Sequence, residues 1–268
     1  MALPPPSESS TALVTGASSG IGAEIARQLA DRGHSVTLVA RREERLRELA
    51  EELRAQRGVR AETMAVDLGD PTARDRLEAG LGELGLAVEV LVNNAGFGDS
   101  NEFHEAERER LVRMAELNCV ALLDLQARFL PPMVERRRGA VINVASTAAF
   151  QPLPGTGTYA ATKAFVLSLG ESTSAELRGT GVSLTTLCPG PVKTEFAQVA
   201  GVGAAEDNLP GIFWTTVEQV AREAVEGAER GKRVVVPGAM NRAGAIAGQH
   251  SPRALALPLT RRLWRQNT

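Results

Sequence analysis

The chain of 268 residues has few of the side chains on which several classes of protein function depend. It contains two cysteines and three histidines, and neither cysteine lies in a C-x-x-C motif or a histidine-rich segment. We therefore expect no metal site, and we expect Cys119 and Cys188, which both lie in apolar surroundings, to be buried free thiols. Such cysteine usage suits a reducing cytoplasm.

Charge of one sign and long hydrophobic runs are also scarce. The 30 Lys and Arg residues nearly balance the 32 Asp and Glu residues, which leaves no excess of basic charge for a nucleic acid or an anionic membrane. No segment approaches the roughly 18 consecutive apolar residues of a transmembrane helix. Residues 1–10 are rich in Pro and Ser and lack the features of a signal peptide, so we expect a flexible N-terminus on a cytoplasmic protein.

The chain does contain a regular alternation of short apolar segments and longer amphipathic ones. This βαβ pattern predicts a doubly wound α/β (Rossmann) fold, in which helices cover both faces of a seven-stranded parallel sheet. No linker divides the chain, so we expect a single domain over residues 1–268. The predicted strands are Thr11–Thr15, Val36–Ala40, Ala61–Val66, Val88–Val92, Ala140–Ala145, Val182–Leu187 and Arg233–Val236.

Amphipathic segments between these strands predict the helices. Asp70 and Pro71 have the residue types of an N-cap and a first helical position, and Pro131-Pro132 predicts the end of a long helix near Glu107–Leu130. Glu195–Trp214 is rich in Gly and Ala and follows the sixth strand, so we expect a substrate lid there. Residues 238–268 form a C-terminal extension. The other predicted helices are Ile21–Asp31, one with Leu46, Leu49 and Leu53 facing inward, Tyr159–Leu177 and Val217–Glu229.

Three glycines join the first predicted strand to the first predicted helix. Glycines let the backbone turn tightly beside a pyrophosphate, and the helix N-terminus offers free N–H groups and a partial positive charge. This strand-turn-helix setting predicts a dinucleotide site. Its candidate residues are Gly16, Ser18, Ser19, Gly20, Ile21 and Gly22.

The same segment matches G-x-S-x-G, the nucleophile elbow of hydrolases, with Ser18 as nucleophile. That alternative requires an oxyanion loop before Ser18, where the chain has only one short strand. It also requires an acid followed by a histidine downstream, and His104 and His250 lie in no informative setting.

Arg41 and Arg42 follow the second predicted strand, where NAD enzymes usually place an acid that binds the ribose 2′-hydroxyl. An acid repels a 2′-phosphate, whereas a guanidinium group can bind it through two hydrogen bonds. The two arginines therefore favour NADP(H) over NAD(H).

Four motifs resemble those of the short-chain dehydrogenase/reductase family, and the resemblance runs from about Thr11 to Val236. They are Thr15-Gly-x-x-x-Gly-x-Gly, Asn93-Asn94-Ala95-Gly96, Tyr159-x-x-x-Lys163 and Pro189-Gly190-x-Val192-x-Thr194. The resemblance implies an NADP(H)-dependent enzyme that transfers a hydride between nicotinamide and a carbonyl or secondary alcohol. A non-enzymatic NADP-binding regulator on the same fold is the alternative.

The resemblance also implies a catalytic tetrad. Tyr159 would be the acid/base, and Lys163 would lower the pKa of its phenol and bind the nicotinamide ribose. Ser146 would polarise the carbonyl, and Asn118 would hold a water of a proton relay. Further cofactor contacts would come from Asp67 and Leu68 at the adenine, from Asn94, Ala95 and Gly96 beside the cofactor, and from Pro189, Gly190, Val192 and Thr194 at the nicotinamide.

Apolar side chains near these motifs indicate the substrate and the assembly. Phe150, Leu153 and Phe213 predict an apolar pocket for a small-molecule ketone or alcohol. Family members form dimers or tetramers through long helices, so the resemblance implies a homodimer or homotetramer. The apolar stripe of Leu111, Leu122 and Phe129 is compatible with such packing. Leucines interleaved with arginines in the extension suit a helix that lies on a membrane surface or packs against a subunit, and we favour subunit packing.

Overall fold

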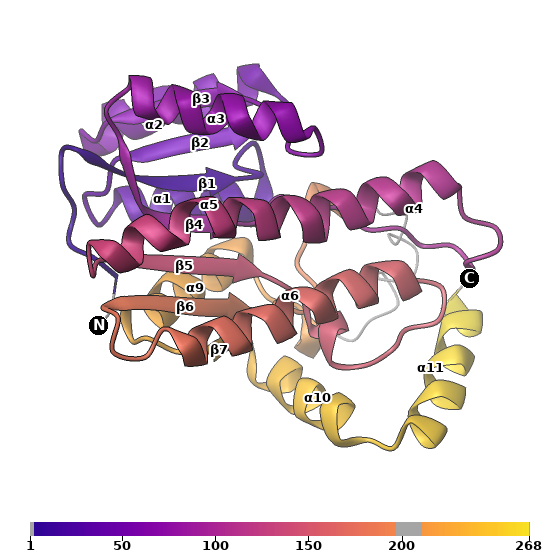
Figure 1. The fold of residues 1–268 in the computed structure, drawn as a ribbon. Helices are drawn as coiled ribbons and strands as arrows, with labels where there is room; N and C mark the ends of the chain where they lie inside the picture. Colours follow the sequence, from indigo (N-terminus) through magenta and orange to yellow (C-terminus); the bar gives the residue numbers. More distant parts are fainter. Residues whose placement is uncertain (1–2, 197–210, 268) are drawn as a thin grey trace.

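The computed structural model describes residues 3–196 and 211–267, which form one seven-stranded sheet flanked by helices (Figure 1). All neighbouring strands run parallel, in the order β3-β2-β1-β4-β5-β6-β7. The predicted doubly wound fold is confirmed. The strands are β1 Ser10–Thr15, β2 Val36–Ala40, β3 Ala61–Ala65, β4 Ala87–Asn93, β5 Gly139–Val144, β6 Val182–Leu187 and β7 Val234–Val235.

Helices cover both faces of this sheet because successive strand residues point to opposite faces. Leu13 and Val14, neighbours in β1, belong to separate hydrophobic clusters with the helices of opposite faces. Figure 1 shows α5 and α6 in front of the sheet and α1 and α9 behind it. The helices are α1 Gly20–Ala30, α2 Glu43–Arg57, α3 Pro71–Glu83, α4 Arg108–Ala115, α5 Leu122–Glu135, α6 Gly157–Glu176, α9 Val217–Glu229, α10 Ala239–His250 and α11 Arg253–Asn267.

Local signals placed several helix boundaries correctly. The Asp70 carboxylate accepts a hydrogen bond from the Thr72 N–H at 2.9 Å, and Pro71 begins α3. In α2, Leu46, Leu49 and Leu53 are all buried, as their spacing predicts. These features depend on residues a few positions apart, so the sequence contains them directly.

The predicted end of the long helix at Pro131-Pro132 is wrong. The helix continues to Glu135 with both prolines inside it, and it contains a π-helical turn, Glu116–Ala121, between α4 and α5. Met133 is fully buried in this last turn, and a Cβ added to Gly139 would lie 2.6 Å from its side chain. This close tertiary packing outweighs the local cost of proline in a helix.

The two chain ends also lie against the fold. Leu3, within the stretch predicted to be flexible, packs against a core cluster. In the C-terminal extension, Asn241 and Ala245 of α10 are buried within their own chain. Thr260 of α11 lines the cavity described below, so this helix lies at its wall. No helix within the described residues is both long and apolar enough to cross a membrane.

Candidate active site

The glycine loop lies where the strand order reverses, between β1 and β4, at the carboxyl ends of the strands. Gly16 and Gly20 adopt φ values of +65° and +56°, which side chains other than glycine rarely adopt. A Cβ added to Gly22 would lie 2.4 Å from the Asn94 side-chain nitrogen. The loop therefore needs glycine both for its backbone shape and for its packing against Asn94.

Polar contacts between Thr15 and the segment after β4 fix this loop. The Thr15 hydroxyl donates to the Val92 carbonyl at 3.0 Å and accepts from the N–H groups of Asn94 and Ala95 at 2.9 and 3.0 Å. The Asn94 side chain donates to the Thr15 carbonyl at 2.9 Å. Thr15, the first residue of the glycine motif, had no role predicted from the sequence, and it holds together two of the predicted cofactor-binding segments.

Arg42 reaches the glycine loop from the end of β2. Its guanidinium group donates to the Ser18 hydroxyl at 3.0 Å and to the Ser19 hydroxyl at 2.7 Å. Arg41 is exposed. Because a guanidinium group cannot accept a proton, Arg42 cannot serve as the base that a nucleophilic Ser18 requires, so this contact does not support the hydrolase alternative.

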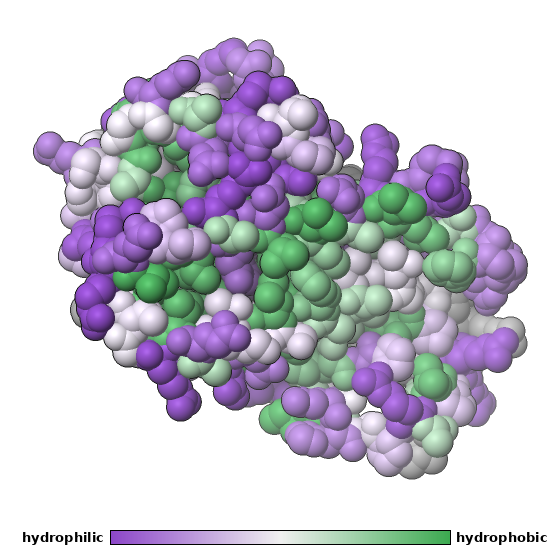
Figure 2. Space-filling view, viewed as in Figure 1, coloured by the Kyte–Doolittle hydropathy of each residue, from purple (hydrophilic) through white to green (hydrophobic). Residues whose placement is uncertain are grey.

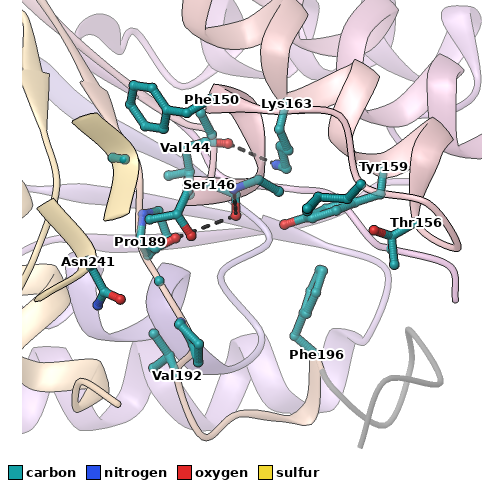
Figure 3. Close-up of a pocket in the computed structure, with 18 of the residues that line it drawn as sticks. Val144, Ser146, Phe150, Thr156, Tyr159, Lys163, Pro189, Val192, Phe196 and Asn241 are labelled. Carbon is teal, nitrogen blue, oxygen red and sulfur yellow. Dashed lines mark hydrogen bonds between the residues drawn. The ribbon is translucent and has the colours of Figure 1, made fainter. Parts of the chain in front are cut away.

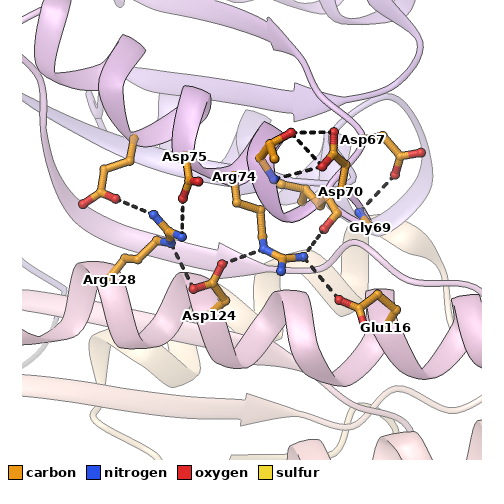
Figure 4. A network of polar contacts seen from close by, with 11 residues as sticks. Asp67, Gly69, Asp70, Arg74, Asp75, Glu116, Asp124 and Arg128 are labelled. Atoms are coloured by element: carbon orange, nitrogen blue, oxygen red, sulfur yellow. Dashed lines mark hydrogen bonds and ion pairs between the residues drawn. The ribbon is translucent and has the colours of Figure 1, made fainter.

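A buried arginine organises the predicted adenine end of the site (Figure 4). Asp67 accepts from the Gly69 N–H at 3.0 Å, which caps the turn after β3. Arg74 of α3 donates to the carbonyl of the adjacent Leu68 at 2.7 Å and to the Asp124 carboxylate of α5 at 2.6 Å. Arg74 thus joins this turn to α5, a role that no local sequence pattern indicated.

The carboxylate that Arg74 shares is charged at neutral pH. Partial burial raises the pKa of Asp124, but hydrogen bonds from Arg128 and Arg74 outweigh that effect and hold its pKa below the usual range. Figure 4 shows Arg128 on the other side of Asp124, where it also binds Asp75. The network therefore keeps one carboxylate between two cations.

Tyr159 and Lys163 project from the same face of α6 into a cavity (Figure 3). The Lys163 ammonium group lies 5.7 Å from the centroid of the Tyr159 ring and donates to the Val144 carbonyl at 2.9 Å. Lys163 is only 5% exposed, and burial lowers its pKa to about 8. Spacing of four residues on one helix brings the two groups together, as the motif predicts.

Ser146 follows β5 on the same wall of the cavity. Its hydroxyl accepts from the Ala148 N–H at 3.1 Å, as the N-cap of a short 3₁₀ turn, and donates to the Pro189 carbonyl at 3.5 Å. Figure 3 shows the Tyr159 ring extending toward Ser146. The serine hydroxyl and the phenol therefore face the same space.

Asn118 lies in the π-helical turn, a feature often found at functional sites. Its side chain accepts from the Phe97 N–H at 3.1 Å, and donates to the Phe97 carbonyl at 2.9 Å and to the Thr162 hydroxyl at 3.0 Å. These contacts place the segment after β4 beside α6: a Cβ added to Gly96 would lie 2.8 Å from the Asn118 oxygen and 3.5 Å from the Lys163 nitrogen. The relay water expected at Asn118 stays a prediction.

The segment Pro189–Thr194 closes another side of the cavity. A Cβ added to Gly20 would lie 3.3 Å from the Thr194 methyl group, so Thr194 lies against the glycine loop. A Cβ added to Gly190 would overlap the side chain of Asn241, whose amide donates to the Phe213 and Pro237 carbonyls at 3.0 and 3.1 Å. Asn241 of α10 thus supports this wall.

The chain is similar to known proteins. Residues 10–202 match the family model of short chain dehydrogenases. The chain belongs to this family. It is 40% identical to sulfoacetaldehyde reductase 2 of Chromohalobacter salexigens over 201 residues, which cover 74% of this chain and 79% of the relative.

Two further short-chain dehydrogenases are similar over most of the chain. One is the NADP-dependent 3-hydroxy acid dehydrogenase YdfG of Salmonella typhimurium, 39% identical over 72% of this chain and 77% of the relative. The other is the solved structure of a short-chain dehydrogenase from Sphingobium yanoikuyae in complex with NADPH. It has a TM-score of 0.80 and 35% identity, and the match covers 92% of this chain and 95% of that one.

In this short-chain dehydrogenase, ten of the 21 predicted site residues line one cavity of about 540 Å³. Arg42 and Asp67 lie beyond it, after β2 and β3 at the same edge of the sheet. Residues 197–210 of the predicted lid lie outside the described residues. The shared cavity walls are formed by Ile21, Asn94, Gly96, Ser146, Tyr159, Lys163, Pro189, Gly190, Val192 and Thr194.

Proposed function

We propose that the protein is an NADP(H)-dependent oxidoreductase that transfers a hydride between nicotinamide and a carbonyl or secondary alcohol. The observation that carries this proposal is the convergence of Ser146, Tyr159 and Lys163 on a cavity that also borders the glycine loop. Two relatives support the cofactor assignment. The YdfG relative is NADP-dependent by name, and the Sphingobium structure is a complex with NADPH.

The residues present fit the dinucleotide. Gly16 and Gly20 adopt the positive φ values that form the tight turn leading into α1, where a pyrophosphate would bind. The start of α1 supplies backbone N–H groups there, and Arg42 supplies a guanidinium group for a 2′-phosphate. Asp67 and Leu68 would border the adenine, and Val192 and Thr194 the nicotinamide carboxamide.

The mechanism follows from the groups on the cavity wall. NADPH supplies the hydride when it is bound. Tyr159 donates a proton to the substrate oxygen, and the nearby Lys163 ammonium stabilises the phenolate that remains. Ser146 donates a hydrogen bond to the same oxygen as negative charge develops on it. To do so, its hydroxyl gives up the 3.5 Å hydrogen bond to the Pro189 carbonyl.

An uncharged ketone or alcohol with a bulky apolar body fits the remaining space. Phe150, Leu153 and Phe213 line the cavity. The buried carboxylate there, Asp99, is neutralised by Arg110 at 2.6 Å. With Asp99 paired, the apolar walls favour a substrate without charge.

Tyr159→Phe tests the chemistry. We expect kcat for a panel of bulky ketones, followed by NADPH absorbance, to fall by about 10²–10⁴-fold, the usual contribution of general acid catalysis. The Kd for NADPH should remain close to wild type, because the ring is retained. Turnover of the variant at the wild-type rate would remove Tyr159 from the mechanism, and NADPH binding without turnover of any ketone by the wild type would favour the regulator.

We further propose a homodimer or homotetramer in the cytoplasm. Leu122 and Phe129 of the predicted stripe are buried in their own chain, so they cannot contact a partner. Instead, Val112, Val120 and Leu123 are 58%, 43% and 42% exposed, and Figure 2 shows hydrophobic side chains gathered over α4 and α5. Light scattering should give twice or four times the mass of one chain, and the mass of one chain would contradict the assignment.

A further inference from the structure

Glu195 joins the predicted phosphate-binding arginine to the segment after β6. Its carboxylate lies 2.7 Å from the Arg42 guanidinium and 3.5 Å from that of Arg45. The same Arg42 guanidinium binds Ser18 and Ser19 of the glycine loop. An acidic side chain thus occupies the cation that the 2′-phosphate of NADP(H) requires.

The Glu195 carboxylate carries the negative charge that competition with a phosphate requires. The hydrogen bond from Arg42 holds the pKa of Glu195 below its usual range, so the group is ionised at neutral pH. A 2′-phosphate carries more negative charge and binds a guanidinium group through two parallel hydrogen bonds. Glu195 binds Nη1 of Arg42, whereas Ser18 and Ser19 bind Nε and Nη2. A phosphate that binds the guanidinium group through Nη1 would displace the carboxylate.

The next residue carries this exchange to the catalytic tyrosine. The Phe196 ring lies 5.6 Å from the Tyr159 ring, tilted by 50°, and Figure 3 shows it across the cavity from Ser146. The Phe196 N–H donates to the Thr194 hydroxyl at 3.2 Å, which closes the turn that holds both residues. Because Glu195 and Phe196 are consecutive residues of this turn, a backbone shift at Glu195 would also shift the Phe196 ring, which covers part of the substrate space.

We propose that Glu195 is a specificity-determining residue that competes with the 2′-phosphate for Arg42, and that its displacement by NADP(H) withdraws Phe196 from Tyr159. The proposal rests on the assignment of Arg42 to the 2′-phosphate. Under it, NADPH binds against an internal competitor, and only the phosphorylated cofactor releases the aromatic wall. NADH leaves the ion pair in place.

Cofactor affinities of Glu195→Gln test the competition. We expect the Kd for NADPH, and for the probe adenosine 2′,5′-bisphosphate, to fall by about two- to fivefold, the range for an exposed ion pair. The Kd for NADH and for AMP should stay unchanged. Glu48→Gln is the matched control, because Glu48 is exposed and lines the same surface groove as Glu195, and its side chain makes no hydrogen bond or ion pair within the described residues.

The outcomes separate the inference from the cofactor assignment. If Arg42→Leu weakens NADPH binding while Glu195→Gln leaves it unchanged, Arg42 binds the phosphate and the competition is refuted. An equal gain in Glu48→Gln would show a general charge effect and would also refute it. If Arg42→Leu binds NADPH as the wild type does, the assignment of Arg42 itself fails. In the Arg42→Leu background, Glu195→Gln should have no effect.

A second measurement tests the link to Phe196. With saturating NADH, the KM for a bulky ketone should be lower in Glu195→Gln than in the wild type, because the ring is released without a phosphate. With saturating NADPH, the two proteins should have the same KM. An unchanged KM with NADH would contradict the withdrawal of Phe196.

Discussion

Lys163→Met should make the protein more stable at neutral pH while it abolishes catalysis. Burial lowers the pKa of Lys163 from 10.5 to about 8, which means that the folded state disfavours its charge. At about 1.4 kcal/mol for each factor of ten, the charged lysine costs the folded state about 3 kcal/mol. Methionine has a similar length and carries no charge, so it removes this cost.

One hydrogen bond is lost in exchange. The Val144 carbonyl, which accepts from Lys163 at 2.9 Å, has no such partner in the variant, and this costs about 1 kcal/mol. The net expectation is a gain of about 2 kcal/mol in the free energy of unfolding at pH 7, measured by urea denaturation without cofactor. Lys232→Met, at an exposed lysine, is the matched control and should change little.

The pH dependence gives the sharper test. Below pH 8, Lys163 is protonated in both states and the folded protein carries the full cost. Between about pH 8 and 10.5 the folded state has released the proton and the unfolded state still binds it, so the free energy of unfolding of the wild type rises with pH relative to the variant. Near pH 10 the two should be almost equally stable. A variant less stable at pH 7, or a difference that does not change with pH, would refute the reasoning.

Two further substitutions test the cofactor site. Arg41→Asp places an acid after β2, where it repels the 2′-phosphate. We therefore expect kcat/KM with NADPH to fall about tenfold, and the ratio of kcat/KM with NADH to kcat/KM with NADPH to rise. A wild-type preference for NADH would contradict the assignment of NADP(H) as cofactor. Arg74→Leu removes the buried hydrogen bonds to Leu68 and Asp124. Arg74→Leu should lower the free energy of unfolding by about 2–3 kcal/mol, as measured by urea denaturation. The Glu116 carboxylate lies 3.7 Å from Arg74, and Glu116→Gln should cost little; equal losses would show that the cost does not come from the two buried hydrogen bonds.

The sequence predicted the elements whose causes are local. Alternation of apolar residues located the strands, and the N-cap at Asp70 follows from residues two positions apart. The proximity of the proposed catalytic pair was predictable for the same reason, since Tyr159 and Lys163 share one helical face. The motifs also matched the family that the comparisons established.

Contacts between distant residues could not be predicted in this way. Arg74 binds a carboxylate fifty positions away, and Asn241 supports Phe213 from another helix. The helix through Pro131 and Pro132 depends on how deeply Met133 is buried, which local propensity does not contain. These residues carry no motif, and only the packing of the sheet shows what they do.

The expectation that Leu122 and Phe129 belong to a subunit interface was wrong for a related reason. An amphipathic pattern identifies which residues share a helix face, but a helix with apolar residues on two faces must direct one of them toward its own sheet. Leu122 and Phe129 are buried within the chain, whereas Val120 and Leu123 are exposed on the surface. Choosing between the two faces requires the position of the sheet.

At Lys163, the proposed function and the stability of the folded state place opposite demands on the side chain. In the proposed mechanism, the ammonium group of Lys163 acts because it is buried beside a phenol, where low dielectric strengthens its effect on the phenolate. The same burial makes its charge costly to the folded state. Only a site supported by extensive packing elsewhere can hold such a group. Lys163 lies on α6 and binds the Val144 carbonyl of β5, and both elements contain fully buried side chains, such as Val166 and Ile142. The conflict is therefore expected to be local: substitutions that relieve it should gain stability and lose turnover, while substitutions in the surrounding core should lose both.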